Sequence, residues 1–303
     1  MSHHDHYLDG PAGRLAYRHW PGPGAKRALI FLPGLTCHAG YFADVAPGFT
    51  PGYDVYALDW RGHGGSAPAA DGDYGFAGYV ADLAALVRAL APTELALVGH
   101  SLGGYVALLY AASAGVPLQP ARIVACDVKT GASADELAGA ARAGGRPQPV
   151  VASLAELAAR LRKSMPDSSA SDAVIARLAA EGAGPAAGGA GPAAEHAGSA
   201  AEGGPPTEGV AFTYDRRALA IGPVDPFAFA GAVACPTLVL CGARSGVMSL
   251  EQASALAAAL PHGRAEQLAD AGHYPFLDAP GAFHAAVGRH LAAADGGASA
   301  PRA

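Results

Sequence analysis

The sequence predicts an α/β fold with a mostly parallel central sheet flanked by helices, and three observations favour this fold. Short apolar runs typical of buried strands alternate with helical patterns between Arg27 and Cys126, as expected for a parallel sheet. The apolar run Leu95–Val98 leads through a Gly-His-Ser-Leu-Gly turn directly into a helical pattern. Strand-like runs resume after a long interruption, at Pro236–Cys241 and Arg264–Leu268. One sheet that is interrupted by an insertion explains all three observations.

The individual elements follow from hydrophobic periodicity and turn residues, taken in chain order. The strands expected before the interruption are a hairpin and four buried runs: Tyr7–Trp20, Arg27–Leu32, Tyr53–Leu58, Glu94–Val98 and Ile123–Cys126. The helices expected beside them are Phe76–Leu90 and Leu102–Ala114. Within the interruption, helices are expected from the capping box at Ser153 to Lys163 and over Ser171–Glu181. The last helices are expected from the capping box at Ser249 to Leu260 and over Pro280–Leu291.

The interruption defines the domain organisation. Residues 129–233 contain helical patterns but no strand typical of a sheet core, so we expect a helical cap on a core of residues 1–128 and 234–293. Residues 182–209 are nearly all Ala, Gly and Pro, and such a segment cannot bury enough apolar surface to offset its ordering entropy. We expect this segment to be a flexible loop and residues 294–303 to be a disordered tail.

Composition and charge exclude several classes of protein. The formal net charge is -6 and the basic residues form no dense stripe, which argues against nucleic-acid binding. No uncharged apolar run is long enough to span a bilayer. The N-terminus, with His3, His4 and His6, is polar and is expected to be a floppy tail without a signal region. We expect a cytoplasmic, bacterial protein that acts on a small molecule, with no nucleic-acid or membrane partner and an oligomeric state that the sequence does not indicate.

The cysteines indicate neither a metal site nor a disulfide framework. They are four in number and lack metal-ligand spacing: Cys37, Cys126, Cys235 and Cys241. Three of them lie in or beside strand-like runs, where small buried thiols are common. This usage favours a reducing compartment, and we expect neither a metal nor a cofactor.

The turn between the strand at Leu95–Val98 and the next helix has the pattern G-x-S-x-G, from Gly99 to Gly103. In a strand–turn–helix context this pattern is typical of a nucleophile elbow, a turn so sharp that its flanking positions must lack bulk. The turn presents Ser101 at the carboxyl edge of the sheet, beside the positive end of a helix. The sequence therefore predicts that Ser101 is a nucleophile.

Four stretches, in this chain order, resemble the α/β-hydrolase fold superfamily. They are Leu32–Leu35, Asp59–Ser66 with the pattern D-x-R-G-H-G-x-S, Gly99–Gly103, and Gly272–Pro275 followed by Asp278. The resemblance covers nearly the whole chain except the low-complexity segment. It implies the α/β-hydrolase fold with an inserted helical cap, as in hydrolases that act on small molecules.

The resemblance and the chemistry of acyl transfer together assign roles to the predicted site residues. Ser101 needs a base to take its proton, and His273 is expected to be that base. The backbone N–H groups of Leu35 and Leu102 are expected to form the oxyanion hole. The positions predicted to shape the pocket are Cys37, His38, Trp60 and Tyr105.

The acid of the expected triad is not where many relatives have it. After the strand that ends at Cys241 the chain reads Gly-Ala-Arg-Ser, so Ser245 stands in the place of an aspartate. Asp127 directly follows the strand Ile123–Cys126, and some members of the superfamily have their acid there. We therefore predict that Asp127 orients His273 and that Ser245 contributes little, with Asp225 and Asp270 as remoter alternatives.

These residues predict a serine hydrolase that cleaves a small carboxylic ester, or a lactone, thioester or amide, through an acyl-serine intermediate. The alternatives are an acyltransferase, a hydrolase of carbon–carbon bonds, a cofactor-free lyase or oxygenase, and a ligand receptor without catalysis. Dehalogenase and epoxide hydrolase chemistry on this fold uses an aspartate nucleophile, so Ser101 argues against both.

Overall fold

The computed structural model describes residues 2–22, 26–185 and 209–293. Its main sheet has eight strands in the order β1-β2-β4-β3-β5-β6-β9-β10. The antiparallel pairs are β1 with β2 and β2 with β4, and all later pairs are parallel. The strands are β1 His4–Gly10, β2 Gly13–Trp20, β3 Arg27–Leu32, β4 Asp54–Leu58, β5 Glu94–His100, β6 Arg122–Cys126, β9 Thr237–Gly242 and β10 Gly263–Leu268. The predicted α/β fold with a mostly parallel sheet is confirmed.

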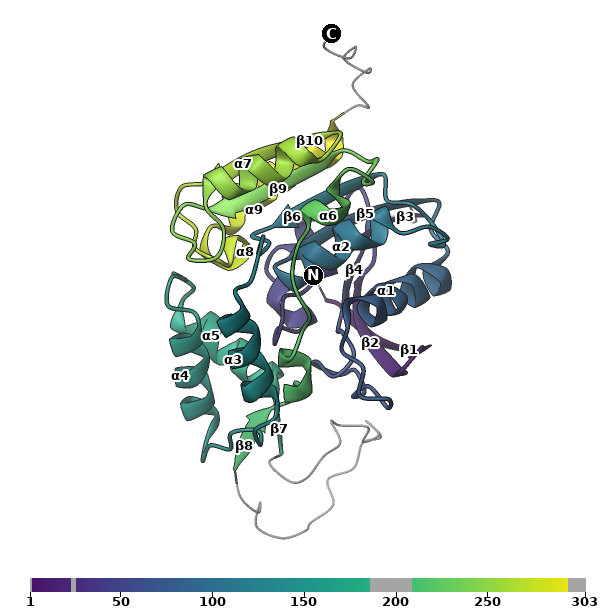
Figure 1. The fold of residues 1–303 in the computed structure, drawn as a ribbon. Helices are drawn as coiled ribbons and strands as arrows, with labels where there is room; N and C mark the ends of the chain where they lie inside the picture. The colour runs from purple at the N-terminus through teal and green to yellow at the C-terminus, as the bar shows by residue number, and fades with distance from the viewer. Residues whose placement is uncertain (1, 23–25, 186–208, 294–303) are drawn as a thin grey trace.

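Helices cover both faces of this sheet (Figure 1). The longer helices are α1 Phe76–Leu90, α2 Leu102–Ala112, α7 Leu250–Ala259 and α9 Pro280–Ala292, and the short ones are α6 Phe227–Ala230, α8 Pro275–Asp278 and the 3-10 helices η1 Ala39–Phe42 and η2 Ala46–Phe49. One buried cluster joins alternate strand residues such as Ile30 to α1, α2 and α7. The other joins residues such as Phe31 to α9, η1 and η2. Because successive strand side chains point to opposite faces, the continuous apolar runs of β3 and β5 serve both layers.

Every element between β6 and β9 except α6 belongs to a group beside the sheet (Figure 1). The group contains α3 Ala134–Gly144, α4 Leu154–Ser164, α5 Asp172–Glu181, a two-stranded hairpin of β7 Ala183–Pro185 and β8 Val210–Phe212, and η3 Arg216–Leu219. Leu157 and Leu161 of α4 are buried, as are Ile175 and Leu178 of α5. Serine side chains cap the N-termini of α3, α4 and α5, which satisfies backbone donors that each helix leaves unpaired.

Some sequence expectations need correction. The N-terminus is not a floppy tail, because β1 begins at His4 and pairs with β2 from His4 to Gly10. Apolar and polar side chains alternate only weakly along β1, so its sequence resembles that of a polar loop. The segment 182–209 contains β7 at its start; its remainder, 186–208, and the tail 294–303 lie outside the described residues.

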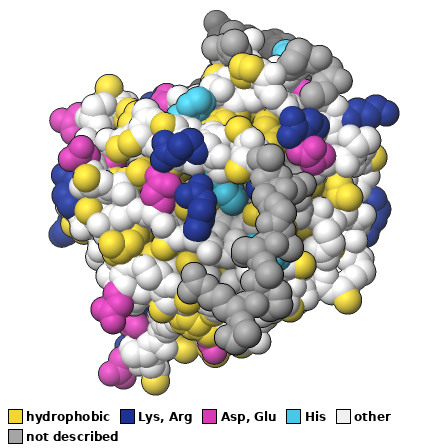
Figure 2. All heavy atoms as spheres, turned by 90° about the horizontal axis from the view of Figure 1, so that it is seen from above, with side chains coloured by type: hydrophobic (Ala, Val, Ile, Leu, Met, Phe, Trp, Pro, Cys, Tyr) yellow, Lys and Arg dark blue, Asp and Glu magenta, His cyan; other side chains and the backbone are white. Residues whose placement is uncertain are grey.

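The surface of the described residues has mixed character. Figure 2 shows basic and acidic side chains interspersed with apolar atoms on the face that it views. Among the described residues, no helix combines the length and the apolar character that a membrane crossing requires.

Candidate active site

Four neighbouring strands bring the candidate reacting groups to one edge of the sheet. In the order β5, β6, β9 and β10, these strands are followed along the chain by Ser101, Asp127, Ser245 and His273. The strands are parallel, so their carboxyl ends meet at the same edge. Residues far apart in the sequence thereby become neighbours.

Ser101 lies between β5 and α2 with φ 50° and ψ −115°. A Cβ atom at Gly99 would lie 2.3 Å from the carbonyl oxygen of Gly103, and one at Gly103 would lie 2.1 Å from that of Leu32. The turn therefore needs glycine at both positions, as the elbow pattern predicts. The Ser101 backbone N–H also donates to the Cys126 carbonyl (2.8 Å), which fixes the turn against the end of β6.

Strain of the same kind recurs around Ser101. In the described residues, the non-glycine residues with positive φ are Thr36, Ala91, Ser101 and Asp127. Ala91 ends α1, whereas the other three surround one site. Such conformations each cost on the order of 1–3 kcal/mol and tend to cluster where function requires them.

Asp127 and His273 form a hydrogen-bonded pair. His273 Nδ1 lies 2.7 Å from Asp127 Oδ1, and the Asp127 side chain is fully buried. Asp127 Oδ2 accepts the backbone N–H of Gly242 (3.1 Å). A neutral His273 that donates Nδ1–H to this carboxylate keeps Nε2 unprotonated, which is the tautomer that a general base needs.

Ser101 and His273 are not hydrogen-bonded to each other in the described structure. Catalytic hydrogen bonds are often long without substrate and tighten in the reactive complex. His100, the neighbour of Ser101, donates Nε2–H to the His273 carbonyl (2.9 Å). Burial holds the pKa of His100 well below its usual value, so this link is a neutral hydrogen bond between the elbow and the histidine loop.

The backbone N–H groups of Leu35 and Leu102 are available near Ser101. Both residues line the same cavity as Ser101, and neither N–H donates to a group in the described part of the chain. Trp60 Nε1 donates to the Pro33 carbonyl (2.8 Å) and thereby holds the loop that carries Leu35. Two free donors beside a serine are suited to stabilise a developing oxyanion.

A family model described as the alpha/beta hydrolase family matches residues 29–286. The chain belongs to the α/β-hydrolase family. The resemblance inferred from its motifs is thus confirmed.

Individual relatives are similar over part of their length. The chain is 36% identical over 103 residues to a "serine hydrolase-like protein" of Danio rerio, covering 34% of this chain and 31% of that one. It is 38% identical over 114 residues to N-formylmaleamate deformylase of Pseudomonas putida, covering 38% and 41%. These stretches span well under two thirds of either relative. The crystal structure of an E-2-(acetamidomethylene)succinate hydrolase is similar in fold, with a TM-score of 0.78, 21% identity and coverage of 96% and 100%.

A cavity of about 230 Å³ opens beside Ser101. Its walls come from the core and from the cap: Leu35, Phe76, Ser101, Leu102, Tyr105, Lys129, Ala132, Glu136, Leu137, Ala140, Leu219, Ile221 and Val224. Most of these side chains are apolar, and Lys129 Nζ pairs with Glu136 at 2.5 Å. The cavity is therefore suited to a small, largely apolar group.

Of the four side chains predicted to shape the pocket, Tyr105 lines this cavity, whereas Cys37, His38 and Trp60 lie outside it. Burial raises the pKa of the Cys37 thiol to about 12, so this cysteine is protonated and unsuited to nucleophilic attack. His38 accepts the Gly40 N–H at Nδ1 (3.2 Å) and donates Nε2–H to the Leu178 carbonyl of α5 (3.1 Å). His38 thus supports the cap.

Sequence reasoning missed the anchors of the histidine loop. Asp167, in the cap, accepts the backbone N–H groups of His273 (3.0 Å) and Gly246 (3.2 Å). Asp278 accepts the Gly272 N–H (2.7 Å) and the Ser168 hydroxyl (2.6 Å). Asp278 stands in the motif that carries the histidine, which was a usable signal. Asp167 belongs to no motif, and only the folded cap brings it to the site.

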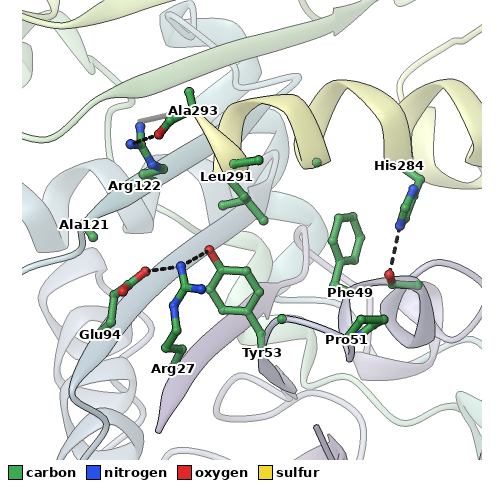
Figure 3. A pocket seen from close by; sticks show the side chains of 14 residues that line it. Arg27, Phe49, Pro51, Tyr53, Glu94, Ala121, Arg122, His284, Leu291 and Ala293 are labelled. Atoms are coloured by element: carbon green, nitrogen blue, oxygen red, sulfur yellow. Dashed lines mark hydrogen bonds and ion pairs between the residues drawn. The ribbon is translucent and has the colours of Figure 1, made fainter. Parts of the chain in front are cut away.

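A larger cavity, of about 620 Å³, lies at the opposite end of the strands (Figure 3). Arg27 and Glu94, the first residues of β3 and β5, line it and pair with each other at 2.7 Å, and Arg27 also donates to the Tyr53 hydroxyl (3.2 Å). None of the predicted site residues lines this cavity. Among the described residues, no group of His, Cys, Asp and Glu side chains could hold a metal ion.

Proposed function

We propose that this α/β hydrolase is a serine hydrolase that cleaves a small carboxylic ester through an acyl-serine intermediate. One observation carries the proposal. Ser101, on a strained turn at an apolar cavity, shares a sheet edge with a histidine whose Nδ1 is hydrogen-bonded to a buried carboxylate. Nucleophile, base and orienting acid in this arrangement are the parts that acyl transfer requires.

The proposed mechanism assigns one step to each group. Ser101 Oγ attacks the substrate carbonyl carbon while His273 Nε2 accepts the hydroxyl proton. The N–H groups of Leu35 and Leu102 stabilise the oxyanion, and Asp127 stabilises the imidazolium. His273 then protonates the leaving alcohol, and the acyl-serine remains. Water, deprotonated by His273, attacks the acyl-serine. His273 then returns this proton to Ser101 Oγ as the acid is released, which restores both residues.

The cavity sets the expected substrate. Its volume of about 230 Å³ and its apolar walls favour a short acyl chain over a long lipid tail. We therefore expect activity on esters such as p-nitrophenyl acetate and butyrate. Product analysis with an added alcohol acceptor separates hydrolysis from acyl transfer.

Labelling with a fluorophosphonate probe, followed by peptide mapping, tests the proposal. The expected adduct is on Ser101, with loss of labelling in Ser101→Ala. Ser113→Ala, at the opposite end of the same helix, is a matched control and should label like the wild type. A folded wild-type protein that takes no label, or takes it on another residue, would sink the serine-hydrolase proposal.

Amide hydrolysis of a small acid is a second candidate, and two observations favour it. Two relatives are named N-formylmaleamate deformylase and 2-(acetamidomethylene)succinate hydrolase. Both names refer to nitrogen-containing acids as substrates. Lys129, a cation that pairs with Glu136, lies in the cavity wall and would exchange this partner for a substrate carboxylate. Higher kcat/KM on N-acyl amides that bear a carboxylate than on neutral esters would favour this candidate, provided that Lys129→Met removes the preference.

A further inference from the structure

The turn after β9 brings a second side chain to the buried carboxylate of Asp127. Ser245 Oγ lies 2.6 Å from Asp127 Oδ1, the same oxygen that lies 2.7 Å from His273 Nδ1. The strand order explains the contact, because β9 lies between β6 and β10 in the sheet. Asp127 therefore has three donors within hydrogen-bond distance, from His273, Ser245 and the backbone of Gly242.

The direction of the Ser245 hydrogen bond is fixed by its other partners. Ser245 Oγ accepts the backbone N–H groups of Val247 (3.0 Å) and Met248 (3.3 Å). A hydroxyl has one proton and two lone pairs, and these two N–H groups use the acceptor capacity. The proton is left for Asp127 Oδ1. The Ser245 hydroxyl therefore donates to Asp127 Oδ1.

Backbone hydrogen bonds also hold this turn, in addition to the two that Ser245 Oγ accepts. The backbone N–H groups of Ala243 and Arg244 donate to the carbonyls of Leu268 and Ala271, both at 2.9 Å. The next helix, α7, is capped by Ser249, whose side chain accepts from Gln252. Loss of the Ser245 hydroxyl therefore removes two backbone contacts of the turn but leaves these other bonds and the α7 cap in place.

We propose that Ser245 is a positioning residue that acts through Asp127: its hydroxyl fixes the carboxylate against His273 and shares its negative charge. This inference rests on the proposed function and extends it. It replaces the sequence-based expectation that Ser245 contributes little. Ser245 stands where many relatives have the acid of the triad, and in this chain it orients that acid, Asp127.

Removal of the hydroxyl has two consequences. Asp127 loses one of its three donors and gains rotational freedom, so His273 spends less time in the productive orientation and kcat falls. The negative charge of Asp127 is also no longer partly neutralised by the Ser245 hydroxyl. Protonated His273 is therefore stabilised to a higher pH than in the wild type. The acidic limb of the kcat/KM profile then moves to higher pH.

Other titratable groups near Asp127 do not interfere with this readout. Burial, joined by the charge of Asp127, raises the pKa of the Cys126 thiol well above its usual value and that of Cys241 to about 11. Burial likewise raises the pKa of Tyr274 and lowers that of His100. These shifts favour the neutral form of all four groups near neutral pH. The acidic limb therefore reports on the His273–Asp127 pair.

Two carboxylates on neighbouring elements also carry charge near His273. Asp167 from the cap and Asp278 from α8 each accept backbone N–H groups of the histidine loop. Neither contacts Ser245 through a side-chain hydrogen bond in the described structure. The bonds of both carboxylates to the histidine loop do not involve Ser245.

The test compares Ser245→Ala, Ser245→Thr and Ser249→Ala in the full-length protein, with p-nitrophenyl butyrate as the substrate. Ser245→Ala should lower kcat roughly tenfold, the usual effect of losing a hydrogen bond to a charged group, with KM changed less than about twofold because the hydroxyl is outside the cavity. Its acidic limb should move up by about 0.5 to 1 pH unit. Ser245→Thr, which keeps the hydroxyl, should restore both values.

Ser249→Ala is the matched control, because it removes a serine four positions away that caps α7 and does not touch Asp127. It should lower the melting temperature without moving the limb. If Ser245→Ala does not fold, Ser245→Cys replaces it, and its weaker donor should give a smaller shift in the same direction.

The outcomes separate this inference from the proposed function. If fluorophosphonate labels Ser101 and Asp127→Asn is inactive, but the Ser245 variants keep wild-type kcat and pH limb, the positioning role is wrong and the proposed function stands. A fall in kcat without any shift of the limb, shared by Ser249→Ala, would also overturn it. If Ser101 takes no label, both proposals fail together.

Discussion

The core and the cap contribute differently to the same site. The core supplies every proposed reacting group, from Ser101 to His273, at the carboxyl ends of adjacent strands. The cap and the segment that returns from it supply much of the cavity wall, including Leu137 and Leu219. Strand order alone fixes the first set, whereas the second depends on how short helices pack. The proposed chemistry thus resides in the core, and the expected selectivity resides mainly in the cap.

The largest expected effect breaks the core. Asp127→Asn keeps the shape of the side chain but removes the charge that orients and stabilises His273, so kcat should fall on the order of 10³- to 10⁴-fold. Steady-state kinetics on an ester substrate measure this loss. Asp270→Asn is the matched control, because it lies on the same edge but is exposed, and its kcat should stay within about twofold of wild type. Equal, mild losses in both variants would contradict the role of Asp127.

Acid should destabilise the core, where all histidines of the described residues lie. Burial lowers the pKa of His63 and of His290 to about 4, whereas an unfolded histidine titrates near 6.5. Between these values the unfolded chain binds protons that the folded chain does not. Stability is therefore unaffected above about pH 6.5 and falls below it, by up to about 1.4 kcal/mol per pH unit for each histidine.

Urea unfolding at a series of pH values checks this slope, and one variant isolates a single contribution. His63→Asn keeps a donor for the Arg61 carbonyl, which accepts from His63 Nδ1 at 2.9 Å, but cannot titrate. Its stability should depend less steeply on pH between 6.5 and 4.5. His262→Asn, at an exposed position, should keep the wild-type slope. Parallel slopes in wild type and His63→Asn would refute the prediction.

A change in the cap should alter selectivity and spare the chemistry. Leu137→Trp fills part of the cavity, so kcat/KM for p-nitrophenyl butyrate should fall roughly tenfold or more, while the acetate ester should be affected much less. The ratio of kcat/KM for the two esters is the measurement. Leu154→Trp, at an exposed leucine of α4, is the matched control and should leave the ratio unchanged. If Leu137→Trp also leaves this ratio at its wild-type value, the cap does not select the acyl group.

The smallest expected effect concerns the stability of the cap alone. Ser133 caps α3 in a capping box with Glu136, and Ser133→Ala should destabilise this helix by about 1 kcal/mol. Hydrogen exchange should speed up in α3 and remain unchanged in the core strands. A uniform increase across the core would show that cap and core unfold together.

The sequence predicted the core better than the cap, for physical reasons. Strands such as Arg27–Leu32 are continuous apolar runs next to glycine-rich turns, so their type and their bounds are strongly encoded. Helix α3 is Ala-rich, with Leu137 as its one large apolar residue, and no periodicity marks which face lines the cavity. Asp127 could be predicted because it follows a strand, whereas its bond to Ser245 depends on side-chain direction in a turn.

The anchors of the histidine loop link the two regions. Asp167 and Ser168 belong to the loop between α4 and α5, yet they bind the backbone of His273 and the side chain of Asp278. The cap is therefore hydrogen-bonded to the main chain of the proposed base and does not only pack beside it. Any displacement of the cap that breaks these hydrogen bonds also removes support from the loop that carries His273.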